Sequence, residues 1–194
     1  MKKKRIFYLI TRSEPGGAQS HVLELLKGFR DQYDLILASG EEGFLLEASR
    51  QLGIQTFLLH SLKRKISPLK DIKAYQEIRD LLLQTKPDLL HTHSSKAGIL
   101  GRLAASKLGL KNIFTAHGWA FAEGTPWSRK LVSIPPEYIA AKWCDRIITV
   151  SNADKQLAVA QHICPSSKIV VIHNGIADIE QYLLANPVNC LLYT

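Results

Sequence analysis

The segment RIFYLITRSEPGGAQSHVLELL, residues 5–26, contains the pattern that determines the fold class. An apolar run of strand character is followed, after a short loop, by apolar residues that recur at helical spacing. Pro15, Gly16 and Gly17 stand between the two. Adjacent glycines at a helix entrance let a ligand approach the backbone and reach the unpaired N–H groups of the first turn. A tight turn between strand and helix is the alternative explanation.

The pattern of a strand followed by a helix recurs along the chain. Stretches of helical periodicity alternate with apolar runs, and Pro135 and Pro136 interrupt one such stretch, where we expect a kink or two short helices. This order predicts an α/β fold: a doubly wound, mostly parallel Rossmann-like sheet of about seven strands with helices on both faces. The further strand candidates are residues 33–39, 54–60, 87–93, 112–118, 145–151 and 168–175.

Composition narrows the range of partners and compartments. The chain has 194 residues, of which 46% are hydrophobic and 22% charged, as in an ordinary globular domain. Its net charge of +8 favours an anionic partner, such as phosphates, nucleic acid or an acidic membrane surface. The three cysteines lack metal-ligand spacing and fit a reducing compartment. The N-terminal apolar run is too short for a secretory signal or a membrane span, so we expect a cytoplasmic protein with peripheral contact to the inner face of the membrane.

Polar residues gather where the predicted strands end. In doubly wound sheets, ligands bind beyond the carboxyl ends of the strands. This gathering therefore favours the ligand interpretation of Gly16 and Gly17 over that of a simple turn. The polar residues at the later strand ends are His91, His93, Ser94, Ser95, His117, Ser151, His173 and Asn174.

Several common site motifs are missing from the sequence. It contains no G-x-G-x-x-G, no G-x-x-x-x-G-K-[ST] and no G-x-S-x-G. His91 and His93 have the spacing of two metal ligands, but no third ligand is suitably placed, so we expect no metal site and a core position for His91. The basic segments lack interleaved aromatic residues, which argues against a nucleic-acid partner.

Two segments are candidates for contact with a membrane. Residues 62–73, LKRKISPLKDIK, are strongly basic and form either a solvated loop and helix start or a surface for anionic head groups. Residues 117–130, HGWAFAEGTPWSRK, are rich in aromatic residues, which either pack in the core or form a pocket lip or membrane-facing loop. The membrane-facing candidates are Lys63, Arg64, Lys65 and Trp127.

Five motifs carry a family resemblance that covers the chain from about residue 4 to residue 182. They are GGAQSHVLELLKGF (16–29), DLLHTHSSKAGILGRLAA (88–105), IFTAHGWAF (113–121), DRIITVS (145–151) and KIVVIHNGI (168–176). Together they resemble the N-terminal half of the family 4 glycosyltransferases, in the variant that builds bacterial polysaccharides and lipid-linked glycans.

The resemblance implies a two-domain GT-B enzyme with the acceptor mainly on the N-terminal domain and a nucleotide-sugar donor on the C-terminal one. It implies transfer of the sugar to a glycan or lipid-linked acceptor, with retention of configuration and without a metal or other cofactor. In this picture, Gly16 and Gly17 approach the donor phosphates and the transferred sugar, while His117 is the catalytic candidate that positions the sugar. The acceptor or cleft candidates are His21, His93, Ser95, Lys96, Trp119, Ser151 and Asn174.

The end of the chain departs from the family pattern. The family usually has N-G-[IV]-D at the hinge, whereas this sequence reads NGIADIEQY with Ala177 before Asp178. We expect residues 1–176 to form the N-terminal domain and residues 177–194 to begin the hinge, with the donor-binding domain supplied in cis or in trans. The chain alone is then expected to be inactive. The alternative is a non-catalytic module that binds the acceptor or a partner in a split glycosyltransferase.

Overall fold

The computed structural model describes residues 3–175, which form one seven-stranded parallel sheet in the order β3-β2-β1-β4-β5-β6-β7. The predicted Rossmann-like sheet is therefore confirmed. The expected hinge at 177–194 lies outside the described residues. The strands are β1 (Arg5–Ile10), β2 (Asp34–Ser39), β3 (Gln55–Leu58), β4 (Leu89–His93), β5 (Asn112–Ala116), β6 (Arg146–Thr149) and β7 (Ile169–Val171).

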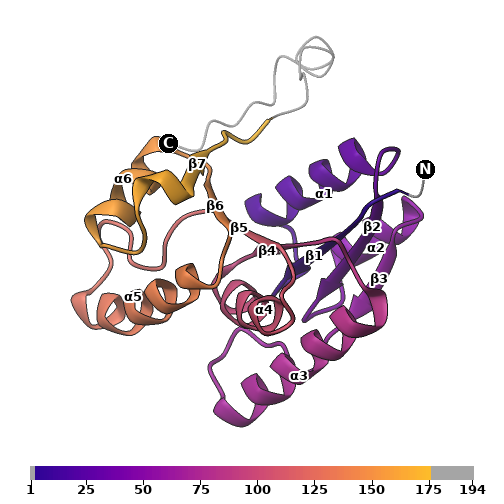
Figure 1. Ribbon diagram of the computed structural model, residues 1–194, viewed down its shortest axis with the longest axis horizontal. Coiled ribbons are helices and arrows are strands. Elements are labelled where there is room, and N and C mark those ends of the chain that lie inside the picture. Colours follow the sequence, from indigo (N-terminus) through magenta and orange to yellow (C-terminus); the bar gives the residue numbers. More distant parts are fainter. Residues whose placement is uncertain (1–2, 176–194) are drawn as a thin grey trace, which may run out of the picture.

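Six α-helices connect the strands, and helices lie on both faces of the sheet (Figure 1). Alternate residues of β1 explain this arrangement, because Tyr8 packs with one pair of helices and Phe7 with the pair on the opposite face. The first face carries α1 (Gly17–Phe29) and α2 (Phe44–Gln51), and the second carries α3 (Pro68–Thr85) and α4 (Ser95–Lys107). The chain continues with α5 (Trp127–Lys142), α6 (Asn152–Ala160) and a 3-10 turn, Ser166–Lys168.

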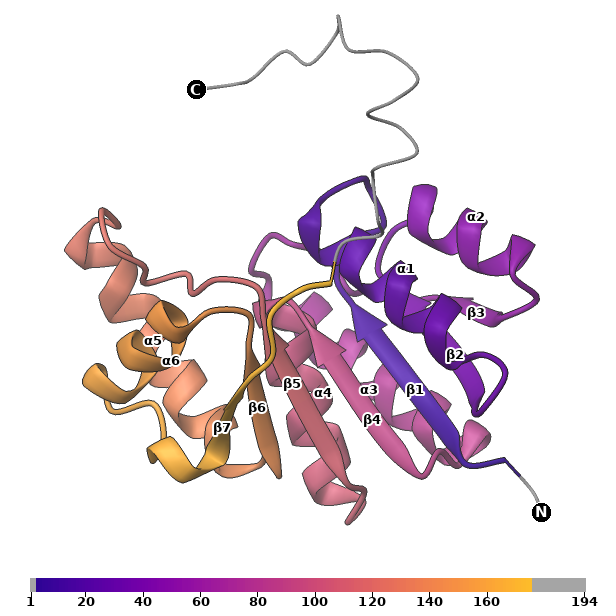
Figure 2. The ribbon, with the colours of Figure 1, turned by 90° about the horizontal axis from the view of Figure 1, so that it is seen from above.

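Helix α4 lies unusually close to the sheet. A Cβ atom at Gly101 would stand 2.7 Å from Thr92 Cγ2, and one at Gly98 would stand 2.8 Å from the Phe114 ring. Glycine at these two positions allows the close approach. Because α4 begins directly after β4, this packing fixes the start of α4 at the carboxyl edge of the sheet, where the strand arrows of β1 and β4 also end (Figure 2).

The prolines of α5 do not divide the helix. Pro135 and Pro136 lie inside a single continuous helix, so the expectation of two short helices is wrong. Proline has a φ angle that fits a helix, and its main cost is the hydrogen bond that it cannot donate. Burial of Glu137, Ala140 and Ala141 just beyond the prolines holds the second half of the helix in place, so packing outweighs the local preference.

Candidate active site

A cluster of histidines lies where the carboxyl ends of β4 and β5 meet α1. His93 ends β4, His117 follows β5, and His21 lies on the second turn of α1. His93 Nδ1 and His117 Nε2 are 3.0 Å apart and share a hydrogen bond. The ring of His21 meets that of His117 edge-on, with the centroids 5.0 Å apart. The structure therefore brings together three of the predicted site residues.

His91 lies on β4 next to this cluster, on the side away from the strand end, and belongs to the core, as predicted. Its side chain is buried, and its Nε2 shares a hydrogen bond of 2.8 Å with Thr115 Oγ1. Its ring centroid is 4.2 Å from that of His93. The ring of His91 therefore packs against the ring of His93. Its hydrogen bond with the Thr115 hydroxyl fixes the orientation of the His91 ring.

Burial keeps the histidine cluster neutral. Together with the smaller effect of neighbouring histidines, it lowers the pKa of His117 to about 4 and that of His91 to about 3. The pKa of His93 falls well below its ordinary value for the same two reasons, and burial also lowers that of His21. At neutral pH, His117 is therefore an uncharged imidazole that can make hydrogen bonds but is a poor base.

Two ring nitrogens of the His93–His117 pair are left without a partner in the described part of the chain. His117 Nδ1 and His93 Nε2 are both buried and accept or donate no hydrogen bond there. One proton lies between the rings, so whichever ring donates it determines whether the free nitrogen of the other donates or accepts. A buried polar atom without a partner is costly, which makes His117 Nδ1 a candidate contact for a bound molecule.

The loop with Gly16 and Gly17 lies at the start of α1, beside the histidines of this edge. Gly16 has an extended backbone with a φ of 176°, and no side chain caps the helix. A Cβ atom at Gly17 would have no heavy atom within 4 Å, and one at Gly16 would meet only the side chain of Gln19. Neither glycine is therefore required by the chain's own packing, which favours a role in leaving room for a ligand.

Replacing Gly17 with alanine tests this interpretation. We expect Gly17→Ala to leave the free energy of unfolding unchanged or to raise it by up to ~1 kcal/mol, because alanine is the better helix former. In an enzyme completed with its donor half, we expect the same change to weaken donor binding at least tenfold. Urea unfolding and donor titration measure the two effects, and Gly28→Ala, at an equally open position of α1, is the matched control. Unchanged donor affinity would support the simple turn.

The start of α4 is tied to the end of β1. Ser94 has a positive φ of 65°, which is rare for a residue with a side chain. Thr11 holds it in place, because the Thr11 N–H donates to Ser94 Oγ at 3.1 Å and the two hydroxyls are 2.8 Å apart. The next residue, Ser95, is exposed. The side chain of Lys96 is engaged within the protein, because its ammonium group donates to Asp71 Oδ1 at 2.7 Å.

The remaining predicted residues separate into structural and exposed groups. Ser151 caps α6 by accepting a hydrogen bond from the Asp154 N–H at 3.0 Å, and Asn174 is exposed beyond β7. Trp119 is only 5% exposed, and its Nε1 donates to the backbone oxygen of Asp154. The prediction that Trp119 lines the cleft is therefore wrong. Trp119 packs in the core together with Phe121, because the chain turns inward after His117.

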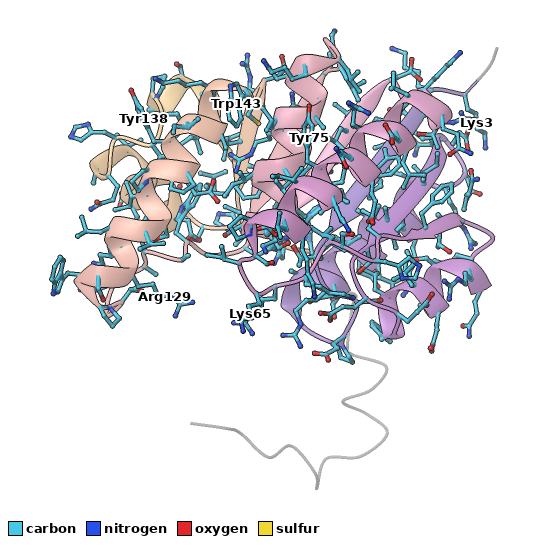
Figure 3. All side chains as sticks on the ribbon, turned by 90° about the horizontal axis from the view of Figure 1, so that it is seen from below. Lys3, Lys65, Tyr75, Arg129, Tyr138 and Trp143 are labelled. Carbon is cyan, nitrogen blue, oxygen red and sulfur yellow. The ribbon has the colours of Figure 1, made fainter. Side chains whose placement is uncertain are left out.

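The basic candidates lie on a different part of the same edge. Lys63 donates to the Gly40 carbonyl, while Arg64 and Lys65 are exposed. Trp127, at the start of α5, is 74% exposed. Figure 3 shows Lys65, in the loop before α3, and Arg129, in the first turn of α5, at the same edge of the molecule.

Sequence reasoning missed a buried ion pair between α4 and α5. Arg102 Nη2 and Glu137 Oε2 are 2.6 Å apart, and the two side chains are 0% and 2% exposed. Glu137 also lines a cavity of about 590 Å³ between α3, α4 and α5. Both residues lie in ordinary amphipathic helices, so no sequence signal indicated the pair. Within residues 3–175, no group of three or more His, Cys, Asp and Glu side chains is arranged to hold a metal ion.

Comparison with known proteins identifies relatives of this chain. A galactosyltransferase of Escherichia coli named for UDP-Gal and α-D-GlcNAc-diphosphoundecaprenol is 38% identical over 153 residues, which are 78% of this chain and 39% of that protein. The O-antigen biosynthesis glycosyltransferase WbnH of E. coli is 25% identical over 178 residues, 92% of this chain and 51% of that one. The chain thus spans about half, or less, of the length of these relatives.

Solved structures share the fold. Anabaena Alr3699/HepE in complex with UDP-glucose superposes with a TM-score of 0.70 at 17% identity, over 93% of this chain and 49% of that one. A glycosyltransferase from Rickettsia africae gives a TM-score of 0.71 at 22% identity, over 91% and 44% of the two chains. The family model of Glycosyltransferase Family 4 matches residues 15–178. The chain therefore belongs to glycosyltransferase family 4.

Proposed function

We propose that this chain is the acceptor-side half of a retaining glycosyltransferase that moves a hexose from a nucleotide sugar to a sugar on a lipid diphosphate. The observation that supports this most directly is the neutral His93–His117 pair, whose free nitrogens lie buried at the sheet edge. The E. coli relative named for a diphosphoundecaprenol-linked sugar supports the acceptor class. Family membership supports sugar transfer, and we propose that no metal ion takes part.

The geometry suggests how the start of α1 and the histidine pair would divide the chemistry between them. When the bond between sugar and phosphate breaks, negative charge develops on the leaving diphosphate. The N–H groups at the start of α1 are free of side-chain caps and would donate to that charge. His117 Nδ1 would hold a hydroxyl of the transferred sugar in place. The neutral ring of His117 positions the sugar and does not remove a proton from it.

The full reaction is proposed to need a donor-binding half, in cis or in trans. The test is to purify the chain alone and joined or mixed with the C-terminal half of its E. coli galactosyltransferase relative. We expect a cooperative thermal melt but no sugar transfer from the chain alone, and transfer to a lipid-diphosphate acceptor once the second half is present. Transfer by the chain alone would contradict the half-enzyme proposal. Acceptor binding without transfer in any combination would instead support the non-catalytic binding module.

An exposed surface beside the cavity supports peripheral contact with an anionic membrane. Ile66, in the loop before α3, and Leu69, in its first turn, are 70% and 77% exposed, and Trp127 and Leu131 on α5 are 74% and 61% exposed. Basic residues lie among them: Lys63, Arg64, Lys65, Lys70, Arg129 and Lys130. No helix in the described residues 3–175 is long and apolar enough to cross a membrane. We therefore propose that these residues lie at the lipid interface.

Vesicle sedimentation tests the membrane surface. We expect the chain to bind anionic vesicles at low salt and neutral vesicles weakly, because each basic residue near the surface adds up to ~1 kcal/mol that salt screens. Replacing Arg64 and Lys65 with glutamate should abolish the preference for anionic lipid. The matched control replaces Lys107 and Lys111, which are exposed at the C-terminal end of α4 and in the loop that follows it, in the same way. Equal binding to both kinds of vesicle would contradict the electrostatic part of the proposal.

A further inference from the structure

The cavity between α3, α4 and α5 opens at the same edge of the sheet as the histidine cluster. Thr11 and Ser94, from the ends of β1 and β4, form part of its lining. Apolar side chains of Ile66, Leu100 and Val132 cover much of the remaining wall. With a volume of about 590 Å³, the cavity has room for a sugar ring and its neighbouring groups.

Two arginines at the cavity have no ion-pair partner within residues 3–175. They are Arg64, in the loop before α3, and Arg129, on the first turn of α5, and both side chains are exposed. The other cations of the lining are engaged, because Lys96 pairs with Asp71 and Arg12 pairs with Glu14 and Glu41. Free guanidinium groups in the lining match the bidentate geometry of phosphate oxygens.

The inner wall of the cavity carries a carboxylate with one unused oxygen. Glu137 is 2% exposed, and its Oε2 accepts a hydrogen bond from Arg102. Its Oε1 is buried and has no hydrogen-bond partner among the described residues. Arg102 is itself fixed, since its Nε donates to the Gly98 carbonyl at 2.8 Å and its guanidinium lies 4.2 Å from the centroid of the Phe114 ring. Among the described residues, the ion pair therefore has an unused acceptor at Oε1 and an unused donor at Arg102 Nη1, which is also buried.

The charges separate the cavity into two zones. A carboxylate repels phosphate, so an anion is favoured only near Arg64 and Arg129, whereas a neutral group with hydroxyls is favoured beside Glu137. A ligand complementary to both zones and to the apolar lining carries hydroxyl groups at one end, a diphosphate next to them and an apolar chain beyond. A sugar linked through diphosphate to a prenyl chain has this order of groups.

We propose that this cavity binds the diphosphate and the adjoining sugar of a prenyl-diphosphate acceptor, with Glu137 Oε1 accepting a hydrogen bond from a sugar hydroxyl. This inference rests on the proposed function and assigns residues to its acceptor. Arg64 and Arg129 bind the diphosphate, and the apolar side chains contact the first units of the prenyl chain. Glu137 is then a specificity residue, because an acceptor without a hydroxyl at that place leaves its oxygen buried and unpaired.

Calorimetric titration of the 194-residue chain tests the inference without a donor. The probes are N-acetylglucosaminyl diphosphate with a short, water-soluble prenyl chain, the same prenyl diphosphate without the sugar, and inorganic diphosphate. We expect the first probe to bind about tenfold more tightly than the second, and Arg64→Ala with Arg129→Ala to weaken both about tenfold. Arg146→Ala, at the opposite end of β6, is the matched control and should change neither.

Two further variants address the inner zone and the mouth of the cavity. Glu137→Leu, which has no side-chain acceptor or donor, should remove the advantage of the sugar-bearing probe and leave the prenyl diphosphate unaffected. Since this change leaves Arg102 without its ion partner, a thermal melt checks folding. Val132→Glu, at a side chain 62% exposed, places a carboxylate at the mouth and should weaken both probes without touching the ion pair.

The outcomes separate the inference from the proposed function. Equal affinity for all three probes, or affinity unchanged in the arginine and Val132→Glu variants, would overturn the cavity assignment. If the completed enzyme still transferred sugar in that case, the proposed function would stand while this acceptor site was wrong. Probe binding that shows the expected losses, with no transfer by the completed enzyme, would support the site and count against the proposed function.

Discussion

His117→Ala is expected to slow sugar transfer by about a hundredfold in an enzyme completed with its donor half, or ~2.7 kcal/mol of transition-state stabilisation. The reason is the buried Nδ1 of His117, which has no hydrogen-bond partner in the described chain and whose ring is held by His93 at 3.0 Å. A fixed donor or acceptor of this kind is worth most where water is excluded. Steady-state kinetics of the purified variant, with folding checked by a thermal melt, measure the loss.

His60→Ala is the matched control for this prediction. His60 is exposed after β3 and outside the histidine cluster, so its replacement should leave turnover unchanged. A loss smaller than about tenfold for His117→Ala would count against a transition-state role. His93→Asn should show an intermediate loss, because it removes the partner that orients His117 and leaves the reacting ring in place.

The pH dependence of the same pair distinguishes positioning from acid–base catalysis. Burial lowers the pKa of His117 to about 4, so the ring stays neutral from about pH 5.5 to 8. The ratio of wild-type to His117→Ala turnover is therefore expected to be constant over that range. A ratio that fell as the pH dropped through 6.5 would show that His117 is protonated with an ordinary pKa, contrary to the buried geometry.

Arg102→Met is expected to lower the free energy of unfolding by about 3–5 kcal/mol, because it leaves Glu137 as an unpaired charge in the core. Arg102 and Glu137 are 0% and 2% exposed, so water cannot replace the missing partner. Replacing both residues, as Arg102→Met with Glu137→Leu, should restore most of the lost stability, since the two apolar side chains no longer require a charge partner. Urea unfolding of the single and double variants measures the coupling.

The double variant also separates stability from ligand recognition. It is expected to fold normally and to lose the preference for the sugar-bearing probe, because Glu137 Oε1 is gone. Arg79→Met provides the control, since Arg79 lies on α3 and, among residues 3–175, forms an ion pair only with its neighbour Asp80 on the surface. If Arg102→Met cost less than about 1 kcal/mol, the pair would be solvated in solution and the closed cavity wall would be wrong.

The parts of the structure that follow from local pattern and from sheet geometry could be predicted from the sequence. Carboxyl ends of parallel strands meet at one edge, so residues at the ends of β4 and β5 had to lie near each other, and His93 and His117 do. The family motifs then indicated which of these residues to consider first. The seven strands and the α1 entrance follow from the same regularity.

The remaining features depend on how helices pack against one another, which the local pattern does not encode. Arg102 and Glu137 are 35 residues apart, and their pairing requires α4 and α5 to lie side by side at one rotation about their axes. Trp119 and Trp127 occur in the same aromatic segment, yet one is 5% exposed and the other 74%. The two tryptophans differ because the chain turns inward after β5, which buries Trp119 and leaves Trp127 exposed.

The position of β1 in the middle of the sheet has a consequence for biosynthesis. Arg5 lies 29 residues from Asp34, the first residue of β2, but 83 residues from Asp88, just before β4. As the ribosome releases the chain from its N-terminus, β1 can pair with β2 early, whereas its other edge stays open until β4 emerges. An open strand edge invites pairing with other nascent chains, so this interval is when the protein is most exposed to aggregation. Pairing with β4 then closes that edge, and the hydrogen bonds between Thr11 and Ser94 fix the chain beyond the ends of the two strands.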